Sequence, residues 1–291
     1  MAGKPVVGFV GVGLMGWGMA KNVVEKGWPL LVIAHRKREA VDDLVGRGAR
    51  EVGSLAEMAA EAEAIVLCVT GSPEVEAAVA EIVPAARPGL TILDASTSDP
   101  EVTERLAREL AATGITLLDT PLSRTPVQAW AGELSTFMGG PGDLVEKWRP
   151  LVAAWASAII PTGGPVGSAH ALKLVNNVVA LGYAAIWAEC FAMARKIGVE
   201  PAVFREVISN SGMNCMNFQN FAKYPVEGDP EGHRFSIANA FKDLSYYERL
   251  TTRHRAATLM SDGALQTLKL GMAMGMAERY VPEMTDIVLA L

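Results

Sequence analysis

Cysteine is scarce in this sequence: Cys68, Cys190 and Cys215 are the three among 291 residues. An odd number of scattered cysteines predicts neither a disulfide framework nor a metal-ligand cluster, and it favours a reducing, cytoplasmic setting. Neither sign of charge is in large excess, because the sequence has 26 Lys and Arg and 32 Asp and Glu, which gives a net charge of -6. This acidic balance argues against nucleic acid or an anionic membrane as the main partner.

Long uninterrupted apolar runs are also lacking. The runs near Ile65 and Val178 are interrupted or too short for a membrane span, and the N-terminus shows no charged-then-apolar leader. Half of the residues are hydrophobic and a fifth are charged. This composition is enough for a sizeable core in one large domain or two ordinary ones, so a soluble intracellular protein is expected.

What is present begins with a strand, a glycine turn and a helix. Pro5–Val10 is rich in β-branched residues, and Trp17–Lys26 has helical spacing. Between them, the G-x-G-x-x-G spacing is typical of a dinucleotide-binding turn, which presents backbone N–H groups and a helix N-terminus to a pyrophosphate. A glycine turn that serves only packing is the alternative. The residues expected at the cofactor phosphates are Gly11, Gly13, Leu14, Met15 and Gly16.

The end of the next strand, Leu30–Ala34, favours NADP over NAD. An acidic residue is expected there for the ribose 2′-OH of NAD, but His35, Arg36, Lys37 and Arg38 precede the first acid. Such a cationic cluster suits a 2′-phosphate, with His35, Arg36 and Lys37 as the binding residues. The alternative is a solvated basic turn at a helix start.

Strand and helix patterns then alternate, which predicts βαβ units and a doubly wound parallel sheet. The loops after its strands should line the cofactor crevice, which puts Thr70, Ser72, Ser96 and Thr97 on the ligand side, with simple loop capping as the alternative for each. The residues expected to contact the cofactor there are Val69, Thr70 and Thr97. The further strands expected are Gly48–Val52, Ala64–Val69, Thr91–Ala95, Ile115–Asp119, Gly132–Gly139 and Ala158–Pro161.

A glycine and proline cluster at residues 163–165 closes this Rossmann domain, so we place a nucleotide-binding domain at 1–164 and an all-helical domain at 165–291. The second domain opens with a long helix over Val166–Ile197 that connects the two. Because this helix is apolar nearly all round, it should be buried on most sides.

Three polar side chains on that helix need an explanation. Lys173, Asn176 and Asn177 share one helix face by their spacing. A lysine among apolar residues should have its pKa lowered towards neutrality, which suits a general acid or base for a carbonyl. Asn176 and Asn177 could orient the lysine or bind a substrate carboxylate. A salt-bridged or snorkelling lysine is the alternative.

Together these motifs resemble the β-hydroxyacid dehydrogenases, the family of 3-hydroxyisobutyrate dehydrogenase and the semialdehyde reductases. The resemblance covers nearly the whole length and rests on five segments in order. They are Gly8–Gly16 with Met19–Asn22, Asp94–Thr97, Asp119–Ser123 with Ala131–Leu134, Gly164–Asn177, and Lys242–Leu244.

The resemblance implies that Lys173 is the general acid in reduction and the base in oxidation. It further implies that Ser123 and Asn177 bind the substrate, that Lys242 lies against the cofactor, and that no metal is needed. Homodimers or homotetramers built from the helical parts are also implied. The expected substrate is a small anionic hydroxy acid or its aldehyde.

One segment departs from the family pattern, in which two glycines follow the serine. Here Arg124 and Thr125 follow Ser123, and an arginine could pair with an anionic substrate head group. The pair resembles that of the sulfolactaldehyde reductases in the same family, although the basic cluster after the second strand does not. A salt bridge within the loop is the alternative role of Arg124.

The leading hypothesis is an NADP-dependent enzyme that interconverts a 3-hydroxy acid and its semialdehyde or keto acid. Reduction of a sulfonated aldehyde recognised by Arg124 is the second. Imine reductases share the architecture, but Lys173 argues against them. A non-catalytic NADP-binding module is the hypothesis from another class, and both Lys173 and Asn177 argue against it.

Overall fold

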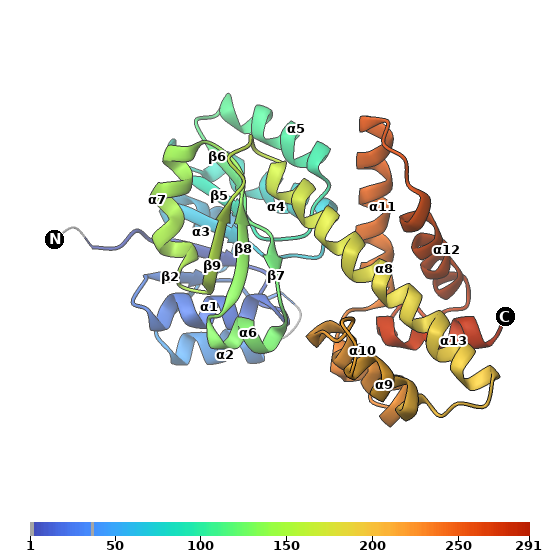
Figure 1. Ribbon diagram of the computed structural model, residues 1–291. Helices are drawn as coiled ribbons and strands as arrows, with labels where there is room; N and C mark the ends of the chain where they lie inside the picture. The colour runs from blue at the N-terminus through green and yellow to red at the C-terminus, as the bar shows by residue number, and fades with distance from the viewer. Residues whose placement is uncertain (1–2, 36–37) are drawn as a thin grey trace. The chain divides into compact units, whose positions relative to one another are not determined.

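The computed structural model describes residues 3–35 and 38–291 (Figure 1). By internal contacts, the chain forms two compact units, Met1–Lys173 and Leu174–Leu291. This division lies within the helix α8 (Ser168–Lys196), whereas the boundary between 164 and 165 lies in the loop before it. The latter stays a prediction.

The centre of the first unit is a parallel sheet. Within the described residues it has six strands in the order β3-β2-β1-β4-β5-β6, and every neighbouring pair is parallel. The predicted doubly wound sheet is therefore confirmed. Its strands are β1 (Val7–Val10), β2 (Leu30–Val32), β3 (Arg50–Glu51), β4 (Ala64–Leu67), β5 (Thr91–Asp94) and β6 (Thr116–Asp119).

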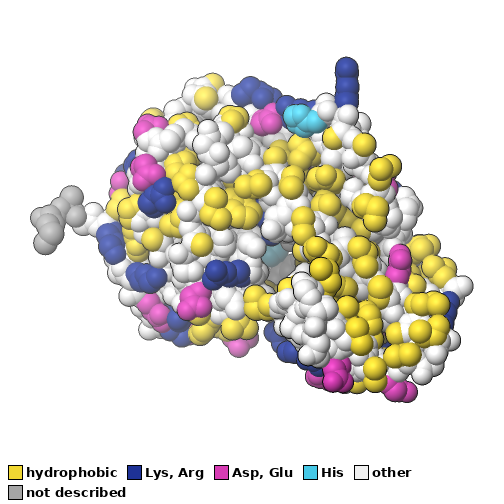
Figure 2. All heavy atoms as spheres, viewed as in Figure 1, with side chains coloured by type: hydrophobic (Ala, Val, Ile, Leu, Met, Phe, Trp, Pro, Cys, Tyr) yellow, Lys and Arg dark blue, Asp and Glu magenta, His cyan; other side chains and the backbone are white. Residues whose placement is uncertain are grey.

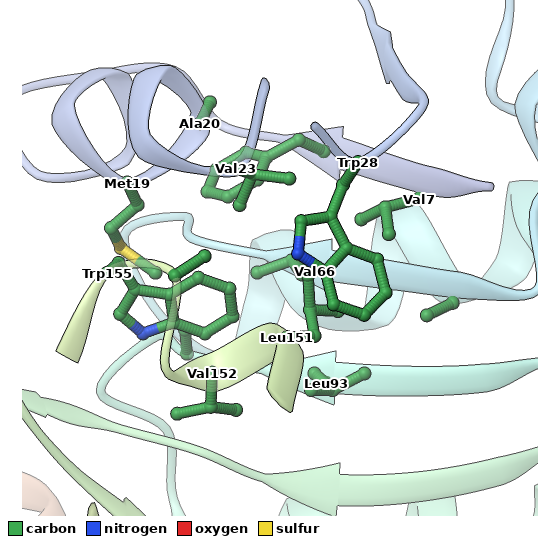
Figure 3. Close-up of a cluster of buried hydrophobic side chains, with 14 of the residues drawn as sticks. Val7, Met19, Ala20, Val23, Trp28, Val66, Leu93, Leu151, Val152 and Trp155 are labelled. Carbon is green, nitrogen blue, oxygen red and sulfur yellow. The ribbon is translucent and has the colours of Figure 1, made fainter. Parts of the chain in front are cut away.

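One face of this sheet carries alternate side chains of each strand, such as Phe9 and Val66, because strand side chains point to opposite faces in turn. They pack against α1 (Gly16–Glu25), α2 (Glu39–Gly46) and α7 (Gly142–Val152). Trp28, Leu151 and Trp155 fill this core, with Met19 and Val23 of α1 beside them (Figure 3).

The opposite face carries the other alternate side chains, such as Ile65 and Ile92, and packs against α3 (Leu55–Glu61), α4 (Ser72–Ile82) and α5 (Pro100–Ala111). A short turn, η1 (Val83–Ala85), follows α4. Helices on both faces explain why the strands are nearly continuous apolar runs rather than alternating ones.

After β6 the chain forms a smaller sheet. Its strands β7 (Leu122–Ser123), β8 (Leu134–Met138) and β9 (Ala156–Pro161) lie in the order β7-β8-β9. The predicted β segments at 132–139 and 158–161 are confirmed as β8 and β9. Neither β7 nor the helix α6 (Pro126–Ala131) was predicted, because the prolines and polar residues of this segment resemble a loop.

Helix α8 begins in the first unit and continues into the second, which is helical throughout (Figure 1). Its inner side packs with Trp187, Phe191 and Phe218 in a second core. The other elements of this unit are α9 (Pro201–Ser209), α10 (Met216–Glu227), η2 (Pro230–His233), α11 (Ile237–His254), α12 (Leu259–Ala273), η3 (Val281–Glu283) and α13 (Met284–Leu289).

The expected burial of α8 on most sides is wrong for one face. Large apolar side chains along it are 40 to 57% exposed at Leu172, Val175, Val179, Tyr183, Ile186 and Met193. Figure 2 shows hydrophobic side chains gathered over the surface that α8 and α9 occupy in Figure 1. Among the described residues, α8 is the one helix long and apolar enough to cross a membrane by length and composition, and half of its apolar window is buried.

Candidate active site

The three glycines between β1 and α1 have three different surroundings. Gly11 has a φ of +94°, and a Cβ there would lie 2.2 Å from the carbonyl oxygen of Cys68. A Cβ on Gly16 would lie 1.9 Å from the carbonyl oxygen of Gly11, whereas a Cβ on Gly13 would meet no atom within 4 Å. Gly11 and Gly16 therefore permit a tight turn and close helix packing, and Gly13 leaves its backbone open to a ligand.

The first turn of α1 is suited to an anion. Its N-cap residue Met15 makes no side-chain cap hydrogen bond, and the first turn holds no acidic residue. The exposed Leu14 precedes it. Open backbone beside Gly13 and the positive end of the helix dipole fit the pyrophosphate of a dinucleotide.

The basic cluster after β2 is described in part. His35 is exposed, while Arg36 and Lys37 lie outside the described residues. Arg38 is bound to two carboxylates, with its Nη2 atom 3.1 Å from Asp42 and 2.9 Å from Glu51. Arg38 is therefore engaged within the protein.

The loops after β4 and β5 are tied together by hydrogen bonds. The N–H of Val69 donates to Ser96 Oγ at 3.0 Å, and Ser96 N and Ser98 Oγ donate to the Asp94 carboxylate at 2.9 and 2.7 Å. Asp94 is 1% exposed. Thr70 is exposed and Thr97 is half-buried at the same strand ends.

Burial also affects the thiol of Cys68 beside Gly11. Desolvation, with a smaller contribution from the negative charge of Asp94, raises the pKa of Cys68 to about 12. The thiol therefore stays protonated near neutral pH, and Cys68 acts as a packing residue.

Asp119, the last residue of β6, caps the start of α8. Its Oδ1 accepts from the backbone N–H of Gly167 at 2.9 Å, and its Oδ2 accepts from Ala169 at 2.7 Å and His170 at 2.9 Å. Asp119 is completely buried, and a Cβ on Gly139 would lie 2.5 Å from Oδ1. A buried carboxylate at a helix N-terminus offsets both the unpaired N–H groups and the dipole.

Lys173 follows this anchored turn on α8. It lies three residues after His170, a rise of about 4.5 Å along the helix. Lys173 is half-buried and belongs to the same unit as the glycine turn after β1 and the loops after β4 and β5. The structure thus places the lysine one helical turn from the carboxyl ends of β5 and β6.

Ser123 ends β7, and Arg124 and Thr125 connect it to α6. Ser123 pairs with Ser135 in the small sheet, and the N–H of Thr125 donates to Gln128 Oε1 at 3.2 Å as a helix cap. Arg124 is exposed with a φ of +87°, and its Nη1 donates to the carbonyl oxygen of Glu133 at 2.6 Å and to Ser157 Oγ at 3.4 Å. A left-handed φ explains why glycine would suit this position.

Asn22 holds α6 against α1. Its side chain is 6% exposed and donates to the carbonyl oxygens of Ala129 at 3.0 Å and Trp130 at 3.1 Å. A Cβ on Gly18 would lie 2.6 Å from Trp130 N, so only glycine allows this close approach. The segment Ser123–Thr125 therefore leads into α6, and α6 is anchored to α1, the helix that follows the glycine turn.

The helical unit contains a second polar group. Asn177 Nδ2 donates to Asp243 Oδ2 at 2.6 Å, and the Lys242 ammonium lies 3.0 Å from Asp243 Oδ1. Asn176 Nδ2 donates to Asn177 Oδ1 at 3.3 Å. The Lys242 Nζ atom also lies 5.1 Å from the centre of the Tyr246 ring. Asp243, 2% exposed, thus orients both predicted ligands, Asn177 and Lys242.

Sequence reasoning did not assign a role to Asp94, Asp119, His170 or Asp243. A carboxylate at the end of a buried strand is a signal that could have found Asp94 and Asp119. Their partners could not be found that way, because His170 lies 67 residues after Thr103, with which it shares a hydrogen bond. Among the described residues, no group of three His, Cys, Asp or Glu side chains could hold a metal ion.

Two family profiles match the chain. The NAD binding domain of 6-phosphogluconate dehydrogenase matches residues 6–164, which is more than half of the chain. The NAD-binding domain of NADP-dependent 3-hydroxyisobutyrate dehydrogenase matches residues 167–286. The chain belongs to the 3-hydroxyacid dehydrogenase family. It is an NAD(P)-dependent oxidoreductase, and NAD or NADP is its cofactor.

Relatives of known activity agree with this family assignment. The mitochondrial 3-hydroxyisobutyrate dehydrogenase of Bos taurus is 27% identical over 96% of this chain and 85% of its own length. The 3-sulfolactaldehyde reductase of Escherichia coli is 30% identical over 82% of this chain and 80% of its own length. The 3-hydroxyacid dehydrogenases act on small hydroxy acids.

Among solved structures, a 3-hydroxyisobutyrate dehydrogenase from Salmonella typhimurium has the same fold. Its TM-score is 0.89 at 24% identity, and the match covers 98% of this chain and 100% of that chain.

Proposed function

We propose that this 3-hydroxyacid dehydrogenase interconverts a small 3-hydroxy acid and its semialdehyde or keto acid, with Lys173 as the general acid and base. The observation that carries the proposal is the position of Lys173 one turn after the Asp119-capped start of α8. The start of α8 lies at the carboxyl ends of β5 and β6. The loops that we expect to contact the dinucleotide follow β4 and β5 at the same edge of the sheet. The dinucleotide supplies or accepts the hydride at the substrate carbon.

In reduction, the Lys173 ammonium donates a proton to the carbonyl oxygen as that oxygen becomes a hydroxyl. In oxidation, the neutral amine removes the hydroxyl proton. Ser123, Asn176 and Asn177 are the proposed substrate ligands, and the bond from Asn177 to Asp243 fixes one of these amides. Lys242 is the proposed contact to the cofactor.

The test is the rate of dinucleotide oxidation with a panel of semialdehydes. Lys173→Ala should lower kcat by roughly 100-fold or more, because a positioned acid supplies about that factor, and should leave cofactor binding unchanged. Lys196→Ala is the matched control, an exposed lysine at the end of the same helix. Lys173→Ala activity within a few-fold of the unsubstituted enzyme would refute the mechanism.

NADPH is the proposed preferred cofactor. The support is the absence of an acid from 35 to 38 in the sequence and the exposed His35. Since Arg38 is bound to Asp42 and Glu51, recognition of the 2′-phosphate is assigned to His35, Arg36 and Lys37.

This preference is measured as the ratio of kcat/KM for NADPH and NADH. Arg36→Ala should lower the ratio by roughly tenfold or more through loss of a charge-assisted phosphate contact. Arg38→Ala, which removes an equal charge two residues away, should leave the ratio within about twofold. A preference for NADH in the unsubstituted enzyme would overturn the assignment.

A sulfonated aldehyde is the second candidate substrate, and Arg124 favours it. Among the described residues, the guanidinium of Arg124 donates hydrogen bonds through Nη1 alone, so Nε and Nη2 have no protein partner there. That pair can bind two oxygens of one anionic head group. The relative from Escherichia coli is named 3-sulfolactaldehyde reductase.

The experiment compares a three-carbon aldehyde bearing sulfonate with the same aldehyde bearing carboxylate. Arg124→Ala should raise KM for the true substrate by roughly tenfold and leave the KM for the cofactor unchanged. Arg149→Ala, an arginine of α7 paired with Glu146, is the control. An unchanged substrate KM would remove Arg124 from the site.

We also propose that the exposed apolar face of α8 covers a second copy of the chain in a homo-oligomer. From Leu172 to Ile186 the side chains of this face recur every three or four residues, and α8 carries no charged residue from Leu174 to Ala188. Val179→Glu should shift the mass measured by light scattering towards the monomer. Val45→Glu, at an exposed valine of α2, should not.

A further inference from the structure

The first turns of α8 contain a histidine that the mechanism does not use. His170 is completely buried, and its Nδ1 lies 2.8 Å from Thr103 Oγ1 on α5. Its backbone N–H is held by Asp119. One residue is thus tied to both β6 and α5.

The neighbours of Thr103 determine which ring nitrogen carries the proton. Thr103 Oγ1 lies 3.1 Å from the carbonyl oxygen of Asp99, and a carbonyl can only accept a hydrogen bond. The hydroxyl proton is therefore directed to Asp99, so Thr103 Oγ1 accepts from His170. In that arrangement, Nδ1 of the imidazole carries the proton and donates to Thr103 Oγ1.

The other ring nitrogen faces the carboxylate that orders the cofactor loops. His170 Nε2 lies 3.8 Å from Asp94 Oδ2 and has no hydrogen-bond partner among the described residues. The same Asp94 oxygen accepts from Ser98 Oγ, and its Oδ1 accepts from Ser96 N. The imidazole therefore lies between α5 and the loop after β5.

We propose that His170, held by Thr103, is a positioning residue for Lys173, which extends the proposed function of that lysine. The bond from Nδ1 to Thr103 fixes the rotation of the first turns of α8 about the helix axis. Lys173 lies on the same helix three residues later, so this rotation sets the direction in which its ammonium group points. Without the bond, the helix start is still capped by Asp119 and still packs against α5 at Gly167, but it loses this hydrogen bond to α5.

The test removes the acceptor and leaves Lys173 in place. Thr103→Val has nearly the same volume and should lower kcat roughly tenfold, about the value of one buried hydrogen bond, with unchanged KM and unchanged Kd of the preferred dinucleotide. Thr103→Ser should restore kcat.

Two further variants separate positioning from general stability. His170→Asn keeps an amide N–H near the place of Nδ1 and should retain more activity than His170→Leu. Thr116→Val is the matched control, since Thr116 Oγ1 shares a 3.0 Å hydrogen bond with Thr91 in the same unit. It should leave kcat unchanged.

The double variant decides the outcome. If Thr103 acts through Lys173, Lys173→Ala with Thr103→Val should be no slower than Lys173→Ala alone, whereas a further tenfold loss would overturn the proposal. If Lys173→Ala is slow but kcat is unchanged in Thr103→Val, the positioning role of His170 is refuted and the proposed function of Lys173 is not. A fast Lys173→Ala would refute the proposed function itself.

Discussion

The cap of α8 by Asp119 allows a quantitative prediction for Asp119→Asn and Asp119→Ala. The buried carboxylate accepts three backbone N–H groups, from Gly167, Ala169 and His170. In Asp119→Asn, the amide oxygen can serve Ala169 and His170, but the amide nitrogen then faces the N–H of Gly167. One charged hydrogen bond and the favourable charge at the helix dipole are lost, so the free energy of unfolding should fall by about 2 kcal/mol.

Asp119→Ala removes all three acceptors and should lower the free energy of unfolding by about 4 kcal/mol, after allowance for water entering the site. Urea unfolding followed by tryptophan fluorescence measures this, because Trp148 and Trp155 are buried in the core of the first unit. Hydrogen exchange should accelerate at the amides of 167, 169 and 170.

The control is Ser54→Ala, which removes the cap of α3 at an exposed helix start and should cost about 1 kcal/mol. If Asp119→Ala unfolds within 1 kcal/mol of the unsubstituted protein, with unchanged exchange at these amides, Asp119 does not stabilise the start of α8 as described.

Three further predictions concern the glycine turn, the backbone at Arg124 and the buried His233. Gly16→Ala should lower the free energy of unfolding by about 2 kcal/mol, because its Cβ meets the carbonyl of Gly11. Gly13→Ala should leave the free energy of unfolding unchanged and weaken dinucleotide binding. Urea unfolding and titration calorimetry measure the two quantities, and equal changes in the two variants would contradict this prediction. Arg124→Gly should be more stable than Arg124→Ala by about 1 kcal/mol, the reverse of the usual order, because φ is +87°; thermal unfolding compares the two. Burial lowers the pKa of His233 to about 4, so the unfolded chain binds the extra proton and stability is lost as the pH falls below about 6.5. Between pH 7 and 5 the loss should be about 2 kcal/mol, and an equal loss in His233→Gln would refute that source.

The nucleotide turn could be predicted because its determinants are local. The spacing of Gly11, Gly13 and Gly16 determines which backbone positions tolerate no Cβ, and the structure finds the two close contacts at Gly11 and Gly16. The alternation of strand and helix likewise predicted the parallel sheet, since both patterns are read over a few neighbouring residues.

The errors arise where composition misled. The prolines and polar residues of 120–131 concealed β7 and α6, whose positions depend on pairing with β8 and on the contact of Asn22 with Ala129 and Trp130. The apolar composition of α8 predicted burial on most sides, but one face is exposed, because an apolar side chain shows only a preference for burial and does not show that a neighbouring residue covers it.

By itself, the sequence determined the dinucleotide turn, the alternating architecture and the placing of Lys173 on a long helix, because these depend on relations within a few residues. Tertiary structure alone decided that Asp119 caps α8, that His170 bonds Thr103 and that Asp243 holds Asn177. Each of those pairs is separated by about 50 to 70 residues. Such groups meet only after the elements that carry them have packed together, so no local pattern of residues could specify which would become partners.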